Sequence, residues 1–235
     1  MLIALLGLAA SFQVHLHGLE DATLVRETTE HVKVGAKAVE KFFGAPFGKE
    51  FNVEVYTSRA GLDELFKTRW KAPPTEKWMV AAGVADGLFL LSPKVWKTEA
   101  VEHAGDAKEV REVVTHELVH VYHAQQNPQP EFDGMDEMAW LVEGVATYAS
   151  GQLKGRENQI RQAIDHGEPK NLSEAWKGQA RYAISGSIVR FVDVAFGRKK
   201  LFGLLHETTN TGALKALGID EATLLRRWRE HELKS

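Results

Sequence analysis

The chain has 235 residues, of which 44 % are hydrophobic and 26 % are charged, proportions typical of a globular protein. It contains no Cys, which excludes a disulfide scaffold, thiolate ligands for zinc or an iron–sulfur cluster, and a cysteine nucleophile. The net charge is −3 and no block of Lys or Arg stands out, so we expect no nucleic-acid partner.

The N-terminal segment MLIALLGLAA carries no charged side chain. It is too short to cross a bilayer as a helix. It fits the apolar part of a secretory signal that lacks its basic leader, or a first buried strand. Residues 1–11 are therefore interpreted as a signal-peptide remnant or as the start of the fold, and the protein as exported (periplasmic or secreted) or cytoplasmic. No later stretch approaches about 18 apolar residues, so we expect no membrane span.

The first half of the chain mixes the patterns of strands and helices. Gly44, followed by Pro46, predicts the end of a long helix, and Ser58 predicts the N-cap of a short one. In chain order the expected elements are strands at 12–17 and 51–56, with helices at 20–43 and 59–67, then a loop at 68–77, one or two strands near a sheet edge within 79–92, and a loop at 93–107.

From residue 107 onward, nearly every segment has the apolar spacing of a helix. The expected helices are 108–126, 135–152, 156–166, 172–177, 181–196, 199–207, 212–217 and 220–233. Strands followed by helices predict the α+β class rather than repeated βαβ units. We expect one domain over residues 12–235, with an N-terminal half at about 12–126 that holds a mixed sheet and helices, and a mostly helical half at about 127–235.

The helix expected at 108–126 contains the sequence His116-Glu-Leu-Val-His120. Two His residues at i and i+4 project from nearly one helix face, so both imidazoles can reach one metal ion at roughly 2.0–2.1 Å. Glu117 lies beside that face, where a carboxylate can act as a base toward a water molecule. The spacing therefore predicts two metal ligands and a base on one helix.

A catalytic zinc site needs a third protein ligand from another element. Glu143 is the one acidic residue within the apolar helical run 138–149, where an isolated buried carboxylate would cost several kcal/mol. Zinc ligation would satisfy that carboxylate. The alternative is a Glu that faces solvent on an amphipathic helix.

HELVH followed by WLVEG resembles the gluzincins, thermolysin-like zinc peptidases, and the wider chain resembles the peptidase MA-like group over about residues 12–230. The segments VAAGVADGLFLLSP, AWLVEGVATYASG and the stretches at 180–197 and 216–228 carry the looser likeness. The resemblance implies a zincin-like catalytic domain with Zn²⁺ as cofactor and a peptide or protein as substrate. It implies His116, His120 and Glu143 as zinc ligands and Glu117 as general base.

In this mechanism a protein donor stabilises the oxyanion of the tetrahedral intermediate. Tyr182 is our choice, because it opens a later helix and matches a tyrosine of the resembling segment. Tyr148 and Tyr122 are competitors, and for each the alternative is a core tyrosine with a satisfied hydroxyl. His123 is expected to support the ligands or to lie on the helix surface rather than to bind the metal.

The strand predicted at 83–92 is the expected substrate edge, because an extended peptide can add to an exposed strand. Asp86 is interpreted as a turn residue rather than as an anchor for a substrate amine, which favours an endopeptidase over an aminopeptidase. Two other hypotheses stay open: a zincin-like domain that binds without cleaving, and a helical interaction module with a chance motif. Substrate and oligomeric state stay open as well.

Overall fold

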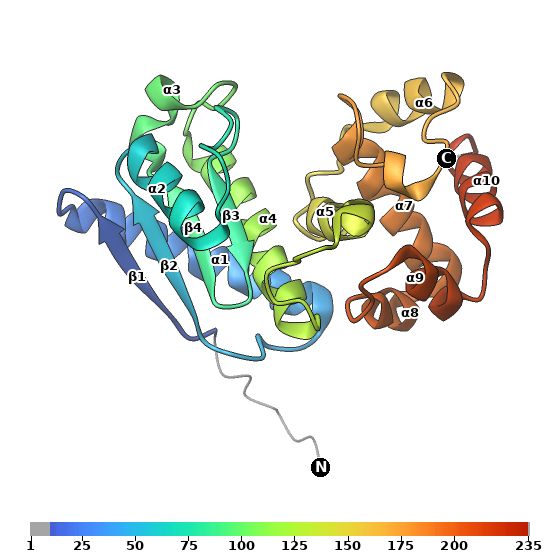
Figure 1. Ribbon diagram of the computed structural model, residues 1–235, viewed down its shortest axis with the longest axis horizontal. Coiled ribbons are helices and arrows are strands. Elements are labelled where there is room, and N and C mark those ends of the chain that lie inside the picture. The colour runs from blue at the N-terminus through green and yellow to red at the C-terminus, as the bar shows by residue number, and fades with distance from the viewer. Residues whose placement is uncertain (1–9, 235) are drawn as a thin grey trace, which may run out of the picture. The chain divides into compact units, whose positions relative to one another are not determined.

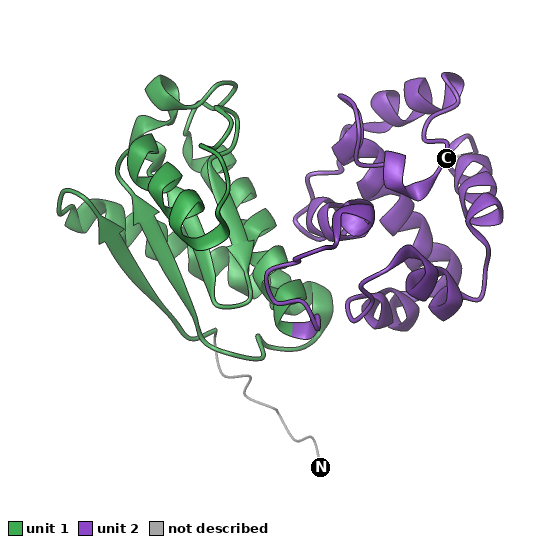
Figure 2. Ribbon diagram, viewed as in Figure 1, with its two compact units in different colours: residues 1–125 green, residues 126–235 purple. Residues whose placement is uncertain are grey.

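The computed structural model describes residues 10–234 (Figure 1). Most of the segment interpreted as a signal-peptide remnant therefore lies outside the described residues. The chain divides into two compact units, residues 1–125 and 126–235 (Figure 2). The first unit holds the sheet and the second is helical, so the α+β class is confirmed.

Within the described part of the first unit, four strands form the sheet: β1 (Phe12–His17), β2 (Phe51–Tyr56), β3 (Ala81–Val84) and β4 (Gly87–Leu91). Their order is β1-β2-β4-β3. β1, β2 and β4 are parallel, whereas β3 pairs antiparallel with β4 through the turn at Ala85 and Asp86. The expected mixed sheet is confirmed, and β3 is an outer strand of it.

Burial follows position in the sheet. Every residue of β4 is buried, as expected of a central strand covered on both faces. The outer strand β1 alternates between half-buried and exposed residues. The apolar residues of the first unit with no exposed surface form its core: Val32, Val39, Val53, Val55, Leu62, Leu88, Leu90, Leu91, Trp96, Val114, Leu118, Val119 and Val121.

Helix α1 (Ala22–Phe43) crosses behind the strands in Figure 1. The Asp21 carboxylate accepts from the Leu24 amide at its N-terminus, and Gly44 ends it in the left-handed conformation with φ of 72°. The expected stop at Gly44 is confirmed. A glycine suits this position because the left-handed region costs it no steric strain.

Helix α2 (Arg59–Trp70) begins after Ser58, whose hydroxyl accepts from the Gly61 amide, as predicted. It runs three residues beyond the expected end at Lys67, so the expected loop begins too early. The Phe66 and Trp70 rings, at i and i+4, meet edge to face at 4.7 Å and stabilise this extra turn.

The segment expected as a loop at 93–107 is also partly helical. It contains the 3₁₀ turn η1 (Pro93–Val95) and the short helix α3 (Trp96–Glu99). Trp96 is completely buried, and its indole N–H donates to the Leu91 carbonyl at 2.8 Å. The burial of Trp96 together with this hydrogen bond, rather than an apolar pattern in the sequence, explains the helical turns.

Helix α4 (Ala107–Gln126) packs between α1 and β3. A Cβ atom on Gly35 of α1 would lie 2.9 Å from the Leu118 side chain. A Cβ atom on Gly83 of β3 would lie 2.2 Å from the Glu117 carbonyl oxygen and 3.1 Å from the Cβ of His120. The contact at Gly83 is with backbone and allows only glycine, whereas a side chain at Gly35 would require the Leu118 side chain to shift. Both glycines therefore let α4 approach its neighbours closely.

The second unit contains eight described helical elements: η2 (Asp136–Met138), α5 (Ala139–Ala149), α6 (Glu157–Asp165), η3 (Leu172–Glu174), α7 (Arg181–Phe196), α8 (Arg198–Leu204), α9 (Asn210–Leu217) and α10 (Glu221–Glu232). The predicted helices are confirmed here to within a few residues. The exception is 172–177, where the structure has only a 3₁₀ turn. The Asp220 carboxylate caps α10 by accepting from the Thr223 amide, as expected.

Close approach of α5 and α7 organises the core of the second unit. A Cβ atom on Gly144 of α5 would lie 2.5 Å from the Ser185 carbonyl oxygen of α7. On α7, Ser187 accepts a hydrogen bond from the fully buried indole of Trp228 at 3.0 Å. α7 is therefore the central helix against which α5 and α10 pack.

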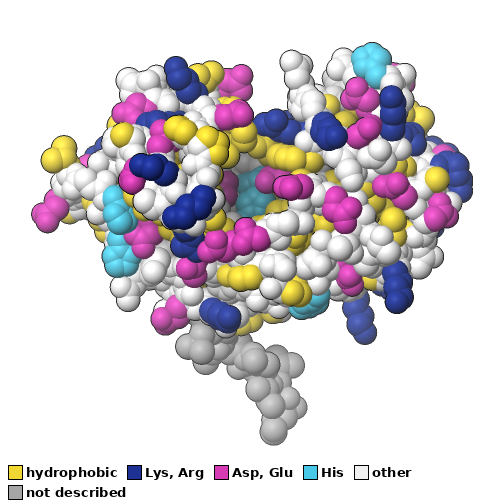
Figure 3. Space-filling view, viewed as in Figure 1, with side chains coloured by type: hydrophobic (Ala, Val, Ile, Leu, Met, Phe, Trp, Pro, Cys, Tyr) yellow, Lys and Arg dark blue, Asp and Glu magenta, His cyan; other side chains and the backbone are white. Residues whose placement is uncertain are grey.

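No helix among residues 10–234 is long and apolar enough to span a membrane. Acidic and basic side chains are interspersed over the face drawn in Figure 3, in both units. This distribution agrees with the small net charge of −3.

Candidate metal centre

The His pair lies on the buried side of α4. His116 and His120 are each 6 % exposed, so their imidazoles are largely withdrawn from solvent. Their Nε2 atoms are 3.1 Å apart and their ring centroids 4.8 Å apart. The helix pitch explains this closeness, because residues at i and i+4 lie one above the other on one face.

The distance between these Nε2 atoms agrees with that of two ligands on one tetrahedral ion. Zn–N bonds of 2.0–2.1 Å at the tetrahedral angle place two ligand nitrogens about 3.3–3.4 Å apart. The 3.1 Å distance in the chain is close to that value.

Glu143 joins the pair as the third member of the group. It lies in the second turn of α5 and is half-buried. One ligand atom from each of His116, His120 and Glu143 lies within 4.8 Å of the other two. Among the described residues this is the one such group of three or more His, Asp or Glu side chains. The group can hold a metal ion, and two imidazoles with one carboxylate are the donor set of known catalytic zinc sites.

Glu117 is half-buried between the two His residues in sequence. Its carbonyl oxygen faces Gly83 of β3 at a distance that leaves no room for a side chain. Sequence reasoning missed this contact, although a Gly inside a strand pattern is a recognised sign of close backbone approach.

The three candidate tyrosines have different surroundings. Tyr122 is buried and stacks on Phe43 with ring centroids 4.1 Å apart, and burial raises the pKa of its hydroxyl. The Tyr148 hydroxyl donates to the Asp193 carboxylate at 2.9 Å, and burial followed by this hydrogen bond raises its pKa. Both hydroxyls therefore favour the protonated form, and the surroundings of Tyr122 are those of a core residue.

Tyr182 lies in the first turn of α7 and is half-buried. Its ring meets Trp176 edge to face at 4.6 Å. The guanidinium groups of Arg156 and Arg181 lie 5.8 and 5.5 Å from its centroid. Cations over the ring are attracted to its π face, so these two groups hold the ring in place.

His123 has no exposed surface. The expectation that it lies on the helix surface is therefore wrong. The other expectation, that His123 supports the metal ligands, stays a prediction. The surface reading failed because α4 is covered on more than one side, as the contacts with α1 and β3 show.

Comparison of the chain with family models, with curated proteins and with solved structures gave no match. The functional assignment therefore rests on the residues of this chain and their geometry.

Proposed function

We propose that this protein is a zinc-dependent metallopeptidase, with His116, His120 and Glu143 as the metal ligands. The observation that carries the proposal is the compact His-His-Glu group, with ligand atoms within 4.8 Å of one another. When bound, Zn²⁺ supplies a Lewis acid that acidifies water and polarises a carbonyl group.

Glu117 is the proposed general base. Its carboxylate accepts a proton from the attacking water and passes that proton to the leaving amine. A site that only held a structural metal would need no base and is usually closed by a fourth protein ligand. The presence of Glu117 beside a three-residue donor set therefore favours catalysis over the alternative, a zincin-like domain that binds without cleaving.

The proposed substrate is a peptide that adds to β3. This strand is at the outside of the described sheet, and Gly83 within it contacts the backbone of Glu117. A peptide extended along this edge is thus held beside the helix that carries the base and two ligands. In the turn after β3, the Asp86 carboxylate forms an ion pair with Arg69 at 2.7 Å. This pairing supports a role for Asp86 in the turn rather than as an anchor for a substrate amine, and so favours an endopeptidase over an aminopeptidase.

The first experiment is elemental analysis of the purified full chain beside Glu143→Ala. We expect close to one zinc per chain and its loss or marked weakening in the variant. Glu112→Ala is the matched control, because this carboxylate is exposed on α4 and outside the group. Absence of zinc after incubation with the metal would reject the proposal.

Glu117→Gln then separates the peptidase from the inactive binding domain. We expect the variant to retain zinc and to lose peptide hydrolysis, because an amide cannot accept the proton. Equal hydrolysis by the variant and the wild type would exclude Glu117 as the base.

A further inference from the structure

The irregular segment 75–79, which leads into β3, is fixed through its backbone carbonyls. The Arg59 guanidinium donates to the carbonyl oxygens of Glu76 and Met79 from Nη1, at 3.3 and 2.5 Å, and to that of Lys77 from Nη2, at 3.2 Å. His103 Nε2 lies 2.9 Å from the carbonyl oxygen of Trp78. Four consecutive carbonyls are therefore held by two side chains.

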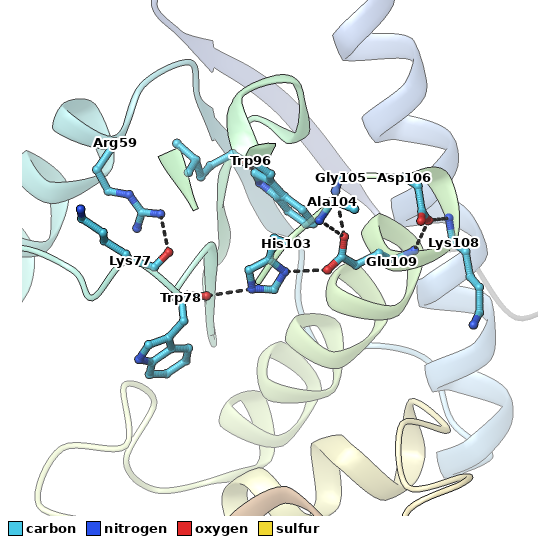
Figure 4. Close-up of polar contacts among 11 residues, drawn as sticks. Arg59, Lys77, Trp78, Trp96, His103, Ala104, Gly105, Asp106, Lys108 and Glu109 are labelled. Carbon is cyan, nitrogen blue, oxygen red and sulfur yellow. Dashed lines mark hydrogen bonds and ion pairs between the residues drawn. The ribbon is translucent and has the colours of Figure 1, made fainter. Parts of the chain in front are cut away.

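The groups that hold the segment are themselves anchored to α4 and α3. His103 Nδ1 lies 2.8 Å from the carboxylate of Glu109, in the first turn of α4. The same carboxylate accepts from the amides of Ala104 and Gly105, both at 2.8 Å (Figure 4). Arg59 Nη2 also donates to the Glu99 carbonyl at 2.8 Å. Segment 75–79 is thus tied to the helix that carries the His pair.

Trp78 is the one aromatic residue of this segment. Its N–H donates to the Glu76 carboxylate, and the residue is half-buried. Figure 4 shows the indole extending away from the Arg59 and His103 groups that hold its backbone. The indole therefore extends from a backbone whose carbonyls are held in place, which lowers the entropy cost of binding against this side chain.

Trp78 lies close to the N-terminal end of β3, the strand to which the peptide is proposed to add. The Val80 carbonyl still accepts from the Leu91 amide at 2.8 Å, so pairing with β4 continues to within two residues of Trp78. Ahead of Val80 the chain is not extended, because the Met79 amide donates to the Glu76 carbonyl at 2.9 Å; Trp78 therefore lies in a turn just before the strand that carries Gly83, the residue that contacts Glu117.

We propose that Trp78 determines specificity, by packing against an apolar side chain of a peptide bound along β3, on the side of Gly83 where β3 begins. This inference rests on the proposed function, because it takes a peptide as the ligand. The preference is one-sided, because the other end of β3 closes in the turn at Ala85 and Asp86.

The test measures binding rather than cleavage, in the zinc-loaded full chain carrying Glu117→Gln. Fluorescein-labelled decapeptides that place Leu, Phe or Ala at each position in turn are titrated by anisotropy. We expect Leu or Phe at one terminal region to tighten binding about tenfold over Ala. Trp78→Ala should abolish this preference and Trp78→Phe should retain most of it.

Phe42→Ala, at a half-buried aromatic residue on α1, is the matched control and should keep the preference. A preference that survives in Trp78→Ala, or the absence of any positional preference, would overturn the proposal. Failure of the proposed function gives a different result: the wild-type chain leaves the bound peptides uncleaved while the Trp78-dependent preference persists.

Discussion

Single glycines decide how closely elements approach α4 and α7. Gly83 and Gly144 both face backbone carbonyl oxygens at distances that exclude a Cβ atom. Gly203 in α8 offers a contrast, because no heavy atom lies within 4 Å of the Cβ position there. Replacement by Ala should therefore have different effects on stability at Gly83 and at Gly203.

Gly83→Ala should lower the free energy of unfolding by roughly 1–3 kcal/mol, because the new methyl group would meet the Glu117 carbonyl at 2.2 Å. Gly203→Ala should be neutral or stabilising by up to about 1 kcal/mol, since Ala favours the helix. Urea denaturation of the two variants measures both effects. Equal stability of Gly83→Ala and the wild type would contradict the close contact.

Tyr182→Phe tests the proposed oxyanion donor. If the hydroxyl stabilises the transition state, kcat should fall by about 10²–10³ with zinc still bound. Tyr148→Phe is the matched control, because its hydroxyl donates to Asp193. The control should lose about 1 kcal/mol of stability with kcat retained. An unchanged kcat in Tyr182→Phe would remove this residue from the mechanism.

At the scale of elements, the start of α4 is held by two carboxylates. Asp106 caps the helix by accepting from the amides of Lys108 and Glu109 at 2.9 and 3.0 Å. Glu109 in turn binds His103 and the amides of Ala104 and Gly105. Charge-assisted hydrogen bonds thus fix the N-terminal end of α4, the helix that carries the His pair.

Glu109→Gln should destabilise the protein by about 1–3 kcal/mol, because an amide offers one acceptor where the carboxylate serves three donors. Glu112→Gln, three residues further along the same helix and exposed, should have little effect. Thermal unfolding followed by circular dichroism compares the two variants. A loss no larger than that of the control would show that Glu109 is not a support of this loop.

The cap at Asp106 also predicts a pH dependence. Hydrogen bonds from the amides of Glu109 and then Lys108 lower the pKa of the Asp106 carboxyl below its usual 3.8. A pKa lowered on folding contributes stability that is present above the unfolded-state value and is lost as the pH falls through the folded-state value. The Tm difference between wild type and Asp106→Ala should therefore be constant from about pH 5 to 7 and shrink below about pH 4. A difference that stays constant at lower pH would contradict the role of the charged cap.

At the scale of the whole molecule, metal binding should be coupled to stability. The proposed ligands lie on α4 and α5, and the unfolded chain does not hold them together. Zinc at about 100 times its Kd should stabilise the native state by about 2.7 kcal/mol. Calorimetry should show a higher Tm with zinc, reversed by a chelator. An equal rise in Glu143→Ala would place the bound metal elsewhere.

Local sequence pattern determined most elements of the fold. Strands at 12–17 and 51–56 and the helix at 181–196 lie where alternation and helical spacing predicted them, because those patterns reflect one buried face. The turns at 93–99 were missed, because burial of Trp96 and its bond to the Leu91 carbonyl stabilise them. The third turn of α2 depends likewise on a ring contact.

For the candidate site, the sequence alone determined the His pair and Glu117, because the spacing i, i+4 on one helix fixes their geometry locally. It also singled out Glu143, as the lone acidic residue in an apolar run, but could not supply the distance between its carboxylate and the two imidazoles. Only the tertiary structure decided that the three ligand groups lie within 4.8 Å, that His123 is fully buried, and that Gly83 contacts Glu117. These features depend on contacts between residues far apart in the chain, which packing of whole elements creates and no local pattern encodes.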